Sequence, residues 1–159
     1  MEGFTIEGEF IPGFLYWHLN FWNTEVDLEV NGRLTDKYTH PLLRDNEWII
    51  ANAINKAEQE RKGLCIFGSR RISKTVFESS YISYGATFDE NSQNVIAGLN
   101  AKDIKLVTDK VDKGLNALPT AWKWQRIEDN WKDQVTLGVR LKDGTRVPFS
   151  YIMIRNLDD

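Results

Sequence analysis

Leu-Cys-Ile-Phe-Gly-Ser-Arg-Arg-Ile-Ser-Lys-Thr, residues 64–75, is the stretch that decides the expected fold. It joins a short apolar run to a near match of the phosphate-binding loop pattern G-x-x-x-x-G-K-[ST]. In such a loop, successive backbone N–H groups surround a phosphate chain, the lysine neutralises its outer charges, and the last hydroxyl binds Mg²⁺. The sequence therefore predicts a site for a nucleoside triphosphate and Mg²⁺, with Thr75 as the residue that holds the metal.

The match departs from the pattern at Ser73, which stands where the second glycine is expected. A serine adds a Cβ and a hydroxyl at a place where the backbone approaches phosphate closely. The alternative is an ordinary turn in which Ser69 or Ser73 caps the next helix and Lys74 lies in solvent. The residues expected to contact the nucleotide are Gly68, Ser69, Ile72, Ser73, Lys74 and Thr75.

The composition is that of one globular domain. The chain has 159 residues, is 42% hydrophobic and carries a net charge of -3, which argues against a generally basic surface that coats nucleic acid. Its one cysteine, Cys65, cannot form a disulfide within the chain, so we expect a reducing compartment and a buried, apolar role for this side chain. No segment reads as a leader peptide or a membrane span.

An aromatic block lies near the N-terminus, and we expect residues 1–40 to form an arm that packs on the core. A cluster this dense is more often packing material than a binding surface. Its members are Phe10, Phe14, Leu15, Tyr16, Trp17, Leu19, Phe21 and Trp22. Helical spacing over 14–21 is compatible with a short helix or an irregular packed arm. Asn31-Gly32 predicts a hairpin turn after the alternating residues 26–30. His18 and His40 lack partners at metal-ligand spacing, so both are expected to be structural hydrogen bonders rather than metal ligands.

The elements around the loop alternate between helix and strand. A helix is expected from a cap at Asp45 or Asn46 to about residue 61, closed by Gly63, and it precedes a buried central strand at 64–67. The helix after the loop is expected to close at Gly85.

The second half of the chain predicts another strand at 94–99 and a helix that begins at Asn100. A hairpin over 135–154 turns at Asp143-Gly144. The expected fold is α/β, with residues 41–159 forming part of a P-loop NTPase domain of the RecA/ASCE-like type. Its mostly parallel sheet has flanking helices and ends in an antiparallel hairpin.

The variant loop at residues 68–75 resembles that of the large terminase subunits of tailed bacteriophages, which drive DNA packaging. Loops of that family commonly carry an arginine shortly after the first position and end in Gly-Lys-Ser/Thr. Residues 41–48 are similar to the family's upstream adenine-binding segment, and residues 94–100 resemble its second strand. The resemblance covers about residues 41 to 155 and implies a DNA-packaging ATPase.

The resemblance implies roles for individual residues. Lys74 would contact the β and γ phosphates, and Arg70 or Arg71 would stabilise charge on the transferred phosphoryl group. Arg44 and Glu47 would lie at the adenine, although the family usually has a glutamine near Glu47. The resemblance also implies double-stranded DNA, a portal and a small terminase subunit as partners of the full-length protein, in the cytoplasm of a bacterial host. The sequence does not distinguish a monomer from a homo-oligomer.

A complete motor also needs a strand that ends in a Mg²⁺-binding aspartate and is followed by a glutamate that activates water. Residues 151–159 do not supply this pattern, so we expect this chain to bind ATP without hydrolysing it, as the N-terminal part of a longer protein. The alternatives are a protein of phage origin that only binds other proteins, and another loop NTPase such as a helicase-like or kinase-like enzyme.

Overall fold

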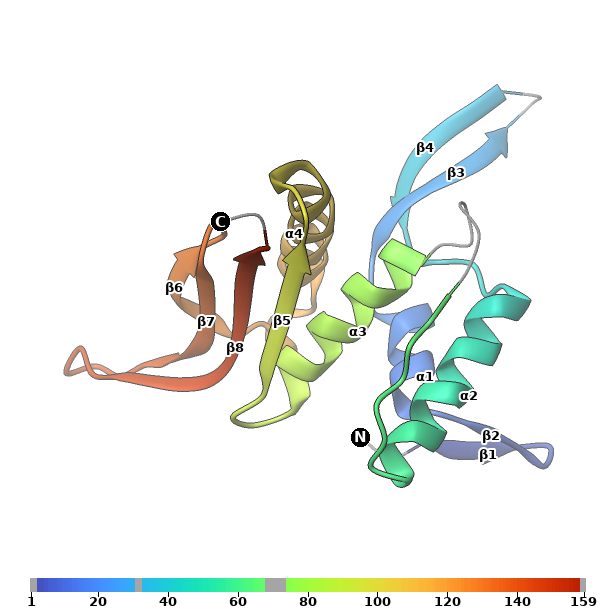
Figure 1. The fold of residues 1–159 in the computed structure, drawn as a ribbon, viewed down its shortest axis with the longest axis horizontal. Coiled ribbons are helices and arrows are strands. Elements are labelled where there is room, and N and C mark those ends of the chain that lie inside the picture. The colour runs from blue at the N-terminus through green and yellow to red at the C-terminus, as the bar shows by residue number, and fades with distance from the viewer. Residues whose placement is uncertain (1–2, 31–32, 68–73, 158–159) are drawn as a thin grey trace. The chain divides into compact units, whose positions relative to one another are not determined.

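The computed structural model describes residues 3–30, 33–67 and 74–157, and it describes the backbone alone within 26–30 and 33–37. The chain divides into two compact units, Met1–Phe77 and Glu78–Asp159, here called the first and second unit. Helix α3 (Lys74–Phe88) begins in the first unit and continues in the second (Figure 1).

The first unit opens with a small antiparallel hairpin of β1 (Phe4–Ile6) and β2 (Glu9–Ile11). Pro12 precedes α1 (Gly13–Asn20), so this segment is a short helix rather than an irregular arm. Trp17 and Trp22 are fully buried, with their rings 5.5 Å apart. Part of the aromatic block is therefore interior packing, although its members Phe10 and Tyr16 are exposed.

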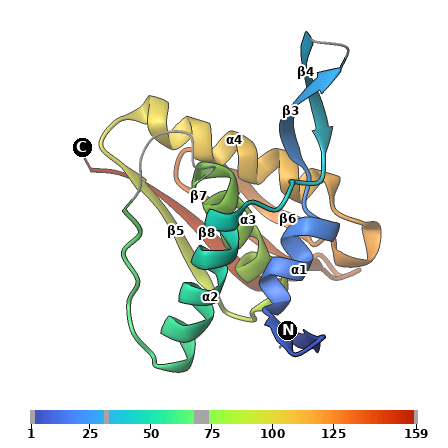
Figure 2. The same ribbon diagram turned by 90° about the vertical axis from the view of Figure 1, so that its right-hand side faces the viewer.

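A longer antiparallel hairpin follows, formed by β3 (Thr24–Val30) and β4 (Arg33–Thr39). The pairing runs from Thr24 opposite Thr39 to Val30 opposite Arg33, as the Asn31-Gly32 signal predicted. The turn residues 31–32 lie outside the described residues. Figures 1 and 2 show that this hairpin projects from the rest of the first unit.

Helix α2 (Asp45–Gln59) confirms the helix predicted from Asp45 or Asn46 to about residue 61, but its caps differ from those predicted. Its N-cap is Arg44, one residue before the predicted caps, because the side chain of Glu47 binds back to the start of this helix. Its C-cap is Glu60, and the residue after the cap, Arg61, adopts φ 52°, so the helix ends before Gly63, the predicted closing residue.

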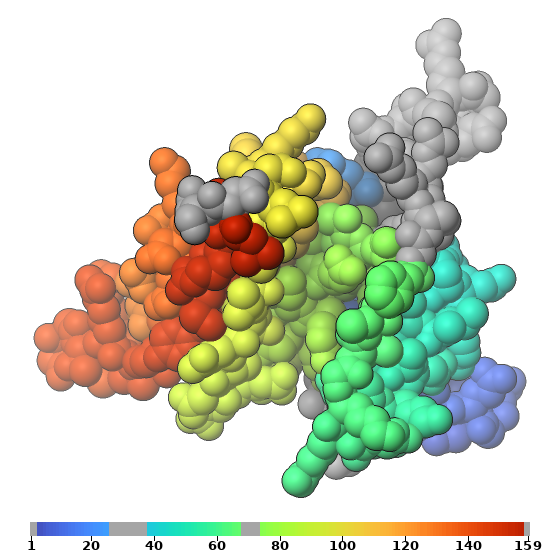
Figure 3. Space-filling view, in the orientation of Figure 1, coloured from blue at the N-terminus to red at the C-terminus, as the bar shows by residue number. Residues whose placement is uncertain are grey.

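The predicted central strand at 64–67 is wrong. None of the described strands pairs with these residues, and they have no regular secondary structure. Leu64 is 41% exposed, Phe67 is 92% exposed and Cys65 is also exposed; Figure 3 shows the green stretch at the molecular surface. A strand needs a neighbour to receive its backbone hydrogen bonds, and apolar composition alone supplies none.

The second unit contains a four-stranded sheet in the order β5-β8-β7-β6. Its strands are β5 (Gln93–Gly98), β6 (Gln125–Asn130), β7 (Gln134–Arg140) and β8 (Arg146–Asn156). Only β5 and β8 pair in parallel, while β8, β7 and β6 pair antiparallel. The sheet is therefore mixed rather than mostly parallel, because β6 and the confirmed β7–β8 hairpin make up three of its strands.

Helix α4 (Ala101–Ala117) packs on β5 and β8, as Figure 1 shows. The side chain of Asn100 accepts a hydrogen bond from the Asp103 N–H at 2.9 Å, which confirms the predicted start. Its buried face holds Ile104, Val111 and Leu115, and the facing strands contribute Ile96, Val135, Leu137, Ile152 and Ile154. This layer of helix on sheet is the core of the second unit.

Helix α3 does not close at Gly85, since it continues to Phe88. A Cβ at Gly85 would lie 3.0 Å from the side-chain oxygen of Asn94, so the glycine serves a close approach rather than a helix end. A 3₁₀ turn, Thr120–Trp122, precedes β6. No helix within the described residues is long and apolar enough to cross a membrane.

Candidate phosphate-binding site

The candidate site is centred on the start of α3. Lys74 and Thr75 are the first two residues of this helix, and both side chains are half-buried. The preceding six residues lie outside the described residues. They are Gly68, Ser69, Arg70, Arg71, Ile72 and Ser73. The described part of the site is therefore the first turn of α3 and the residues that pack against it.

The electrostatics of this first turn favour an anion. A helix N-terminus carries about half a positive charge from its aligned peptide dipoles and presents N–H groups without partners inside the helix. The first turn of α3 contains no acidic residue, and it contains the cation Lys74. Such a turn can hold a phosphate group, and Thr75 supplies a hydroxyl at the position where the loop pattern places the magnesium ligand.

Phe77 fixes this turn against α1. Its side chain is 1% exposed, and its ring meets Phe14 edge-on at 5.0 Å and His18 at 5.1 Å between centroids. Burial lowers the pKa of His18 from 6.5 to about 4, so the imidazole is neutral at pH 7. His18 thus packs as an aromatic ring against Phe14 and Phe77.

Arg44 and Glu47, expected near the adenine, lie at the start of α2. The Glu47 carboxylate accepts a hydrogen bond from the Arg44 N–H at 3.2 Å, and the Glu47 side chain is 2% exposed. Burial raises the pKa of Glu47, while this hydrogen bond and the charge of Arg44 oppose the rise. Glu47 therefore caps its own helix, and the Arg44 side chain is exposed.

Replacing Glu47 with glutamine should keep the cap and remove the cost of burying a negative charge. We expect unfolding in urea at pH 7 to show equal or greater stability for Glu47→Gln than for the wild type. Glu47→Ala, which removes the acceptor, should lose about 1 kcal/mol. A glutamine variant that loses as much as the alanine variant would show that the charge itself is needed.

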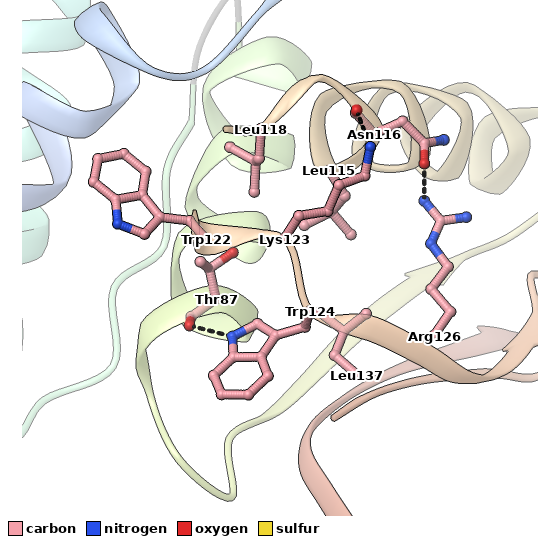
Figure 4. A pocket seen from close by; sticks show the side chains of 9 residues that line it. All are labelled: Thr87, Leu115, Asn116, Leu118, Trp122, Lys123, Trp124, Arg126 and Leu137. Atoms are coloured by element: carbon pink, nitrogen blue, oxygen red, sulfur yellow. Dashed lines mark hydrogen bonds between the residues drawn. The ribbon is translucent and has the colours of Figure 1, made fainter. Parts of the chain in front are cut away.

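A pocket in the second unit is a separate feature (Figure 4). The Trp124 ring donates from Nε1 to the Thr87 carbonyl at 2.8 Å, and Lys123 donates to the Asn116 carbonyl at 2.6 Å. The remaining lining residues are Leu115, Leu118, Trp122, Arg126 and Leu137. Its volume of about 20 Å³ suits one water molecule, so it is too small for a nucleotide.

Arg126 beside this pocket is a structural connection. Its guanidinium lies 2.6 Å from Asp112 of α4 and 3.3 Å from Asp129 of β6, and it stacks over the Trp131 ring at 5.5 Å. It therefore ties the helix to the edge strand. Among the residues that the structure describes, no group of three or more His, Cys, Asp or Glu side chains could hold a metal ion.

The sequence did not reveal the contact between α1 and the start of α3. Phe14 and Phe77 are 63 positions apart, and no local pattern links them. The only available signal was the helical spacing of Phe14 and His18, which placed both on one side of a short helix. Comparison with protein-family models gives no match for this chain, and a search of curated proteins finds no similar sequence.

Proposed function

We propose that this chain binds a magnesium nucleoside triphosphate through residues 68–75. The observation that carries the proposal is that α3 begins at Lys74, which puts the lysine and Thr75 of the motif in the first turn of a 15-residue helix. In this arrangement the helix N-terminus and the lysine both attract the phosphate chain. The first turn of α3 contains no acidic residue.

The proposed ligand is ATP with Mg²⁺. Lys74 would neutralise the outer phosphates, Thr75 would hold the magnesium ion, and Arg70 or Arg71 would stabilise charge at the γ phosphate. The adenine would lie near Arg44 and Glu47. We propose a P-loop NTPase fold from the loop motif at 68–75 together with the helix α3 that follows it.

From the resemblance of the loop, the proposed process is DNA packaging by a large terminase subunit of a tailed bacteriophage. In such a motor, nucleotide binding shifts the arrangement of the domains that grip DNA. The supporting observation is that the loop motif is followed along the chain by helix α3 and then by strand β5. Strand β5 overlaps the segment 94–100 that resembles the second strand of this family.

A thermal melt with increasing Mg²⁺–ATP tests the proposal. Saturation at about 100 times Kd should stabilise the chain by about 2.7 kcal/mol, equivalent to a rise in Tm of roughly 5–10 °C. Lys74→Ala removes a charge-assisted contact and should weaken binding about 10- to 100-fold.

The matched control is Lys105→Ala, which removes an exposed helical lysine that pairs with Asp109 at 2.8 Å. This variant should show the full shift in Tm. The same shift in the Lys74 variant would contradict the site, and no shift in the wild type would contradict nucleotide binding.

A second candidate is a non-enzymatic interaction protein, and the exposed run at 64–67 favours it. Phe67 is 92% exposed, and exposed aromatic side chains often anchor protein partners. Under this reading Mg²⁺–ATP would leave the Tm unchanged.

A further inference from the structure

Phe77 lies one turn after Lys74 on the same helix, and residues three apart are neighbours on a helix surface. Lys74 is half-buried and Phe77 is 1% exposed, so this side of the first turn faces the interior of the first unit. The direction of the turn is therefore set by whatever holds the Phe77 ring.

Two rings of α1 hold it. Phe14 meets Phe77 at 5.0 Å with an interplanar angle of 81°, and His18 meets it at 5.1 Å with an angle of 62°. Phe14 and His18 are four residues apart on α1, and their own rings lie 6.0 Å apart. Edge-to-face contacts depend on orientation, so two of them restrict both the rotation and the translation of the first turn of α3.

We propose that Phe77 is a positioning residue for the bound triphosphate. Through its contacts with α1 it fixes the turn from which Lys74 and Thr75 extend, and thereby sets where these two groups meet the phosphates. The inference rests on the proposed nucleotide site and adds to it a residue that does not touch the ligand. The phosphate-binding pattern does not include this position.

The first experiment measures the affinity of the full chain for a fluorescent ATP analogue with Mg²⁺, at a temperature where each variant is folded. Phe77→Leu keeps an apolar side chain but removes both ring contacts, and it should weaken binding about tenfold. Phe14→Leu removes one of the contacts from the α1 side and should weaken binding in the same direction.

The matched control is Phe88→Leu, at the other end of α3. The centroid of the Phe88 ring lies 5.1 Å from that of Tyr84 and 5.8 Å from that of Trp122. Replacing this ring with leucine therefore also disturbs aromatic packing. This variant should keep wild-type affinity. A loss equal to that of Phe77→Leu would show that general destabilisation explains the effect, and would overturn the inference.

A double-mutant cycle separates positioning from a merely structural role. Because Phe77 is proposed to position Lys74 and Thr75 together, Phe77→Leu should weaken binding less in the Lys74→Ala background than in the wild type. Additive losses, or wild-type affinity in Phe77→Leu and Phe14→Leu, would overturn the inference while leaving the nucleotide site in place. Wild-type affinity in Lys74→Ala would overturn the proposed function itself.

Discussion

Replacement of Trp17 with alanine is expected to lower the free energy of unfolding by about 3–5 kcal/mol. Trp17 is fully buried in α1, and its ring lies 5.5 Å from that of Trp22. Truncation removes a large apolar area from the interior and leaves a cavity that the surrounding rings fill only in part. Urea unfolding followed by circular dichroism measures the loss.

Phe67→Ala is the matched aromatic control, and its expected effect is within about 0.5 kcal/mol of zero. The Phe67 ring is 92% exposed, so its truncation removes little buried area. A loss of several kcal/mol in this variant would show that residues 64–67 are interior after all, and a small loss in Trp17→Ala would show that α1 is not part of the core.

Acidification should destabilise the chain through His18. The pKa of His18 is lowered by burial from 6.5 to about 4, so the unfolded chain binds a proton at a pH where the folded chain does not. Above about pH 6.5, His18 is neutral in both the folded and the unfolded chain and does not lower the free energy of unfolding. As the pH falls from 6.5 to about 4, protonation of the unfolded chain lowers that free energy progressively. The total loss over this interval is roughly 3 kcal/mol.

The measurement compares the free energy of unfolding of wild type and His18→Phe between pH 7.5 and pH 4. The difference between the two proteins should shift by about 3 kcal/mol in favour of the variant as the pH falls, because phenylalanine keeps a ring and binds no proton. Replacing the exposed His40 with glutamine should leave the His18 effect in place. A difference that does not depend on pH would contradict the burial of His18.

The sequence predicted an element correctly where the interactions that form it lie between residues close together in the chain. Asn100 and Asp103 predict the start of α4 because the cap joins residues three apart, and the two form that hydrogen bond. Asp143-Gly144 predicts the β7–β8 turn, where Gly144 adopts φ 87°.

The predictions that were wrong depended on distant neighbours. The apolar run 64–67 has the composition of a buried strand, but only a pairing strand could make it one. Gly85 reads as a helix end, yet its role is to admit the side chain of Asn94 from β5. The ring contacts of Phe77 with Phe14 and His18 likewise join residues of two separate helices, α3 and α1. The periodic pattern of one helix cannot predict such contacts.

The most direct test of the central proposal is competition for the site between a fluorescent ATP analogue and fragments of ATP in the presence of Mg²⁺. Because the first turn of α3 and residues 68–73 are proposed to hold the phosphate chain, inorganic triphosphate should displace the analogue and adenosine should not. Failure of the analogue to bind, or displacement by adenosine alone, would contradict the account.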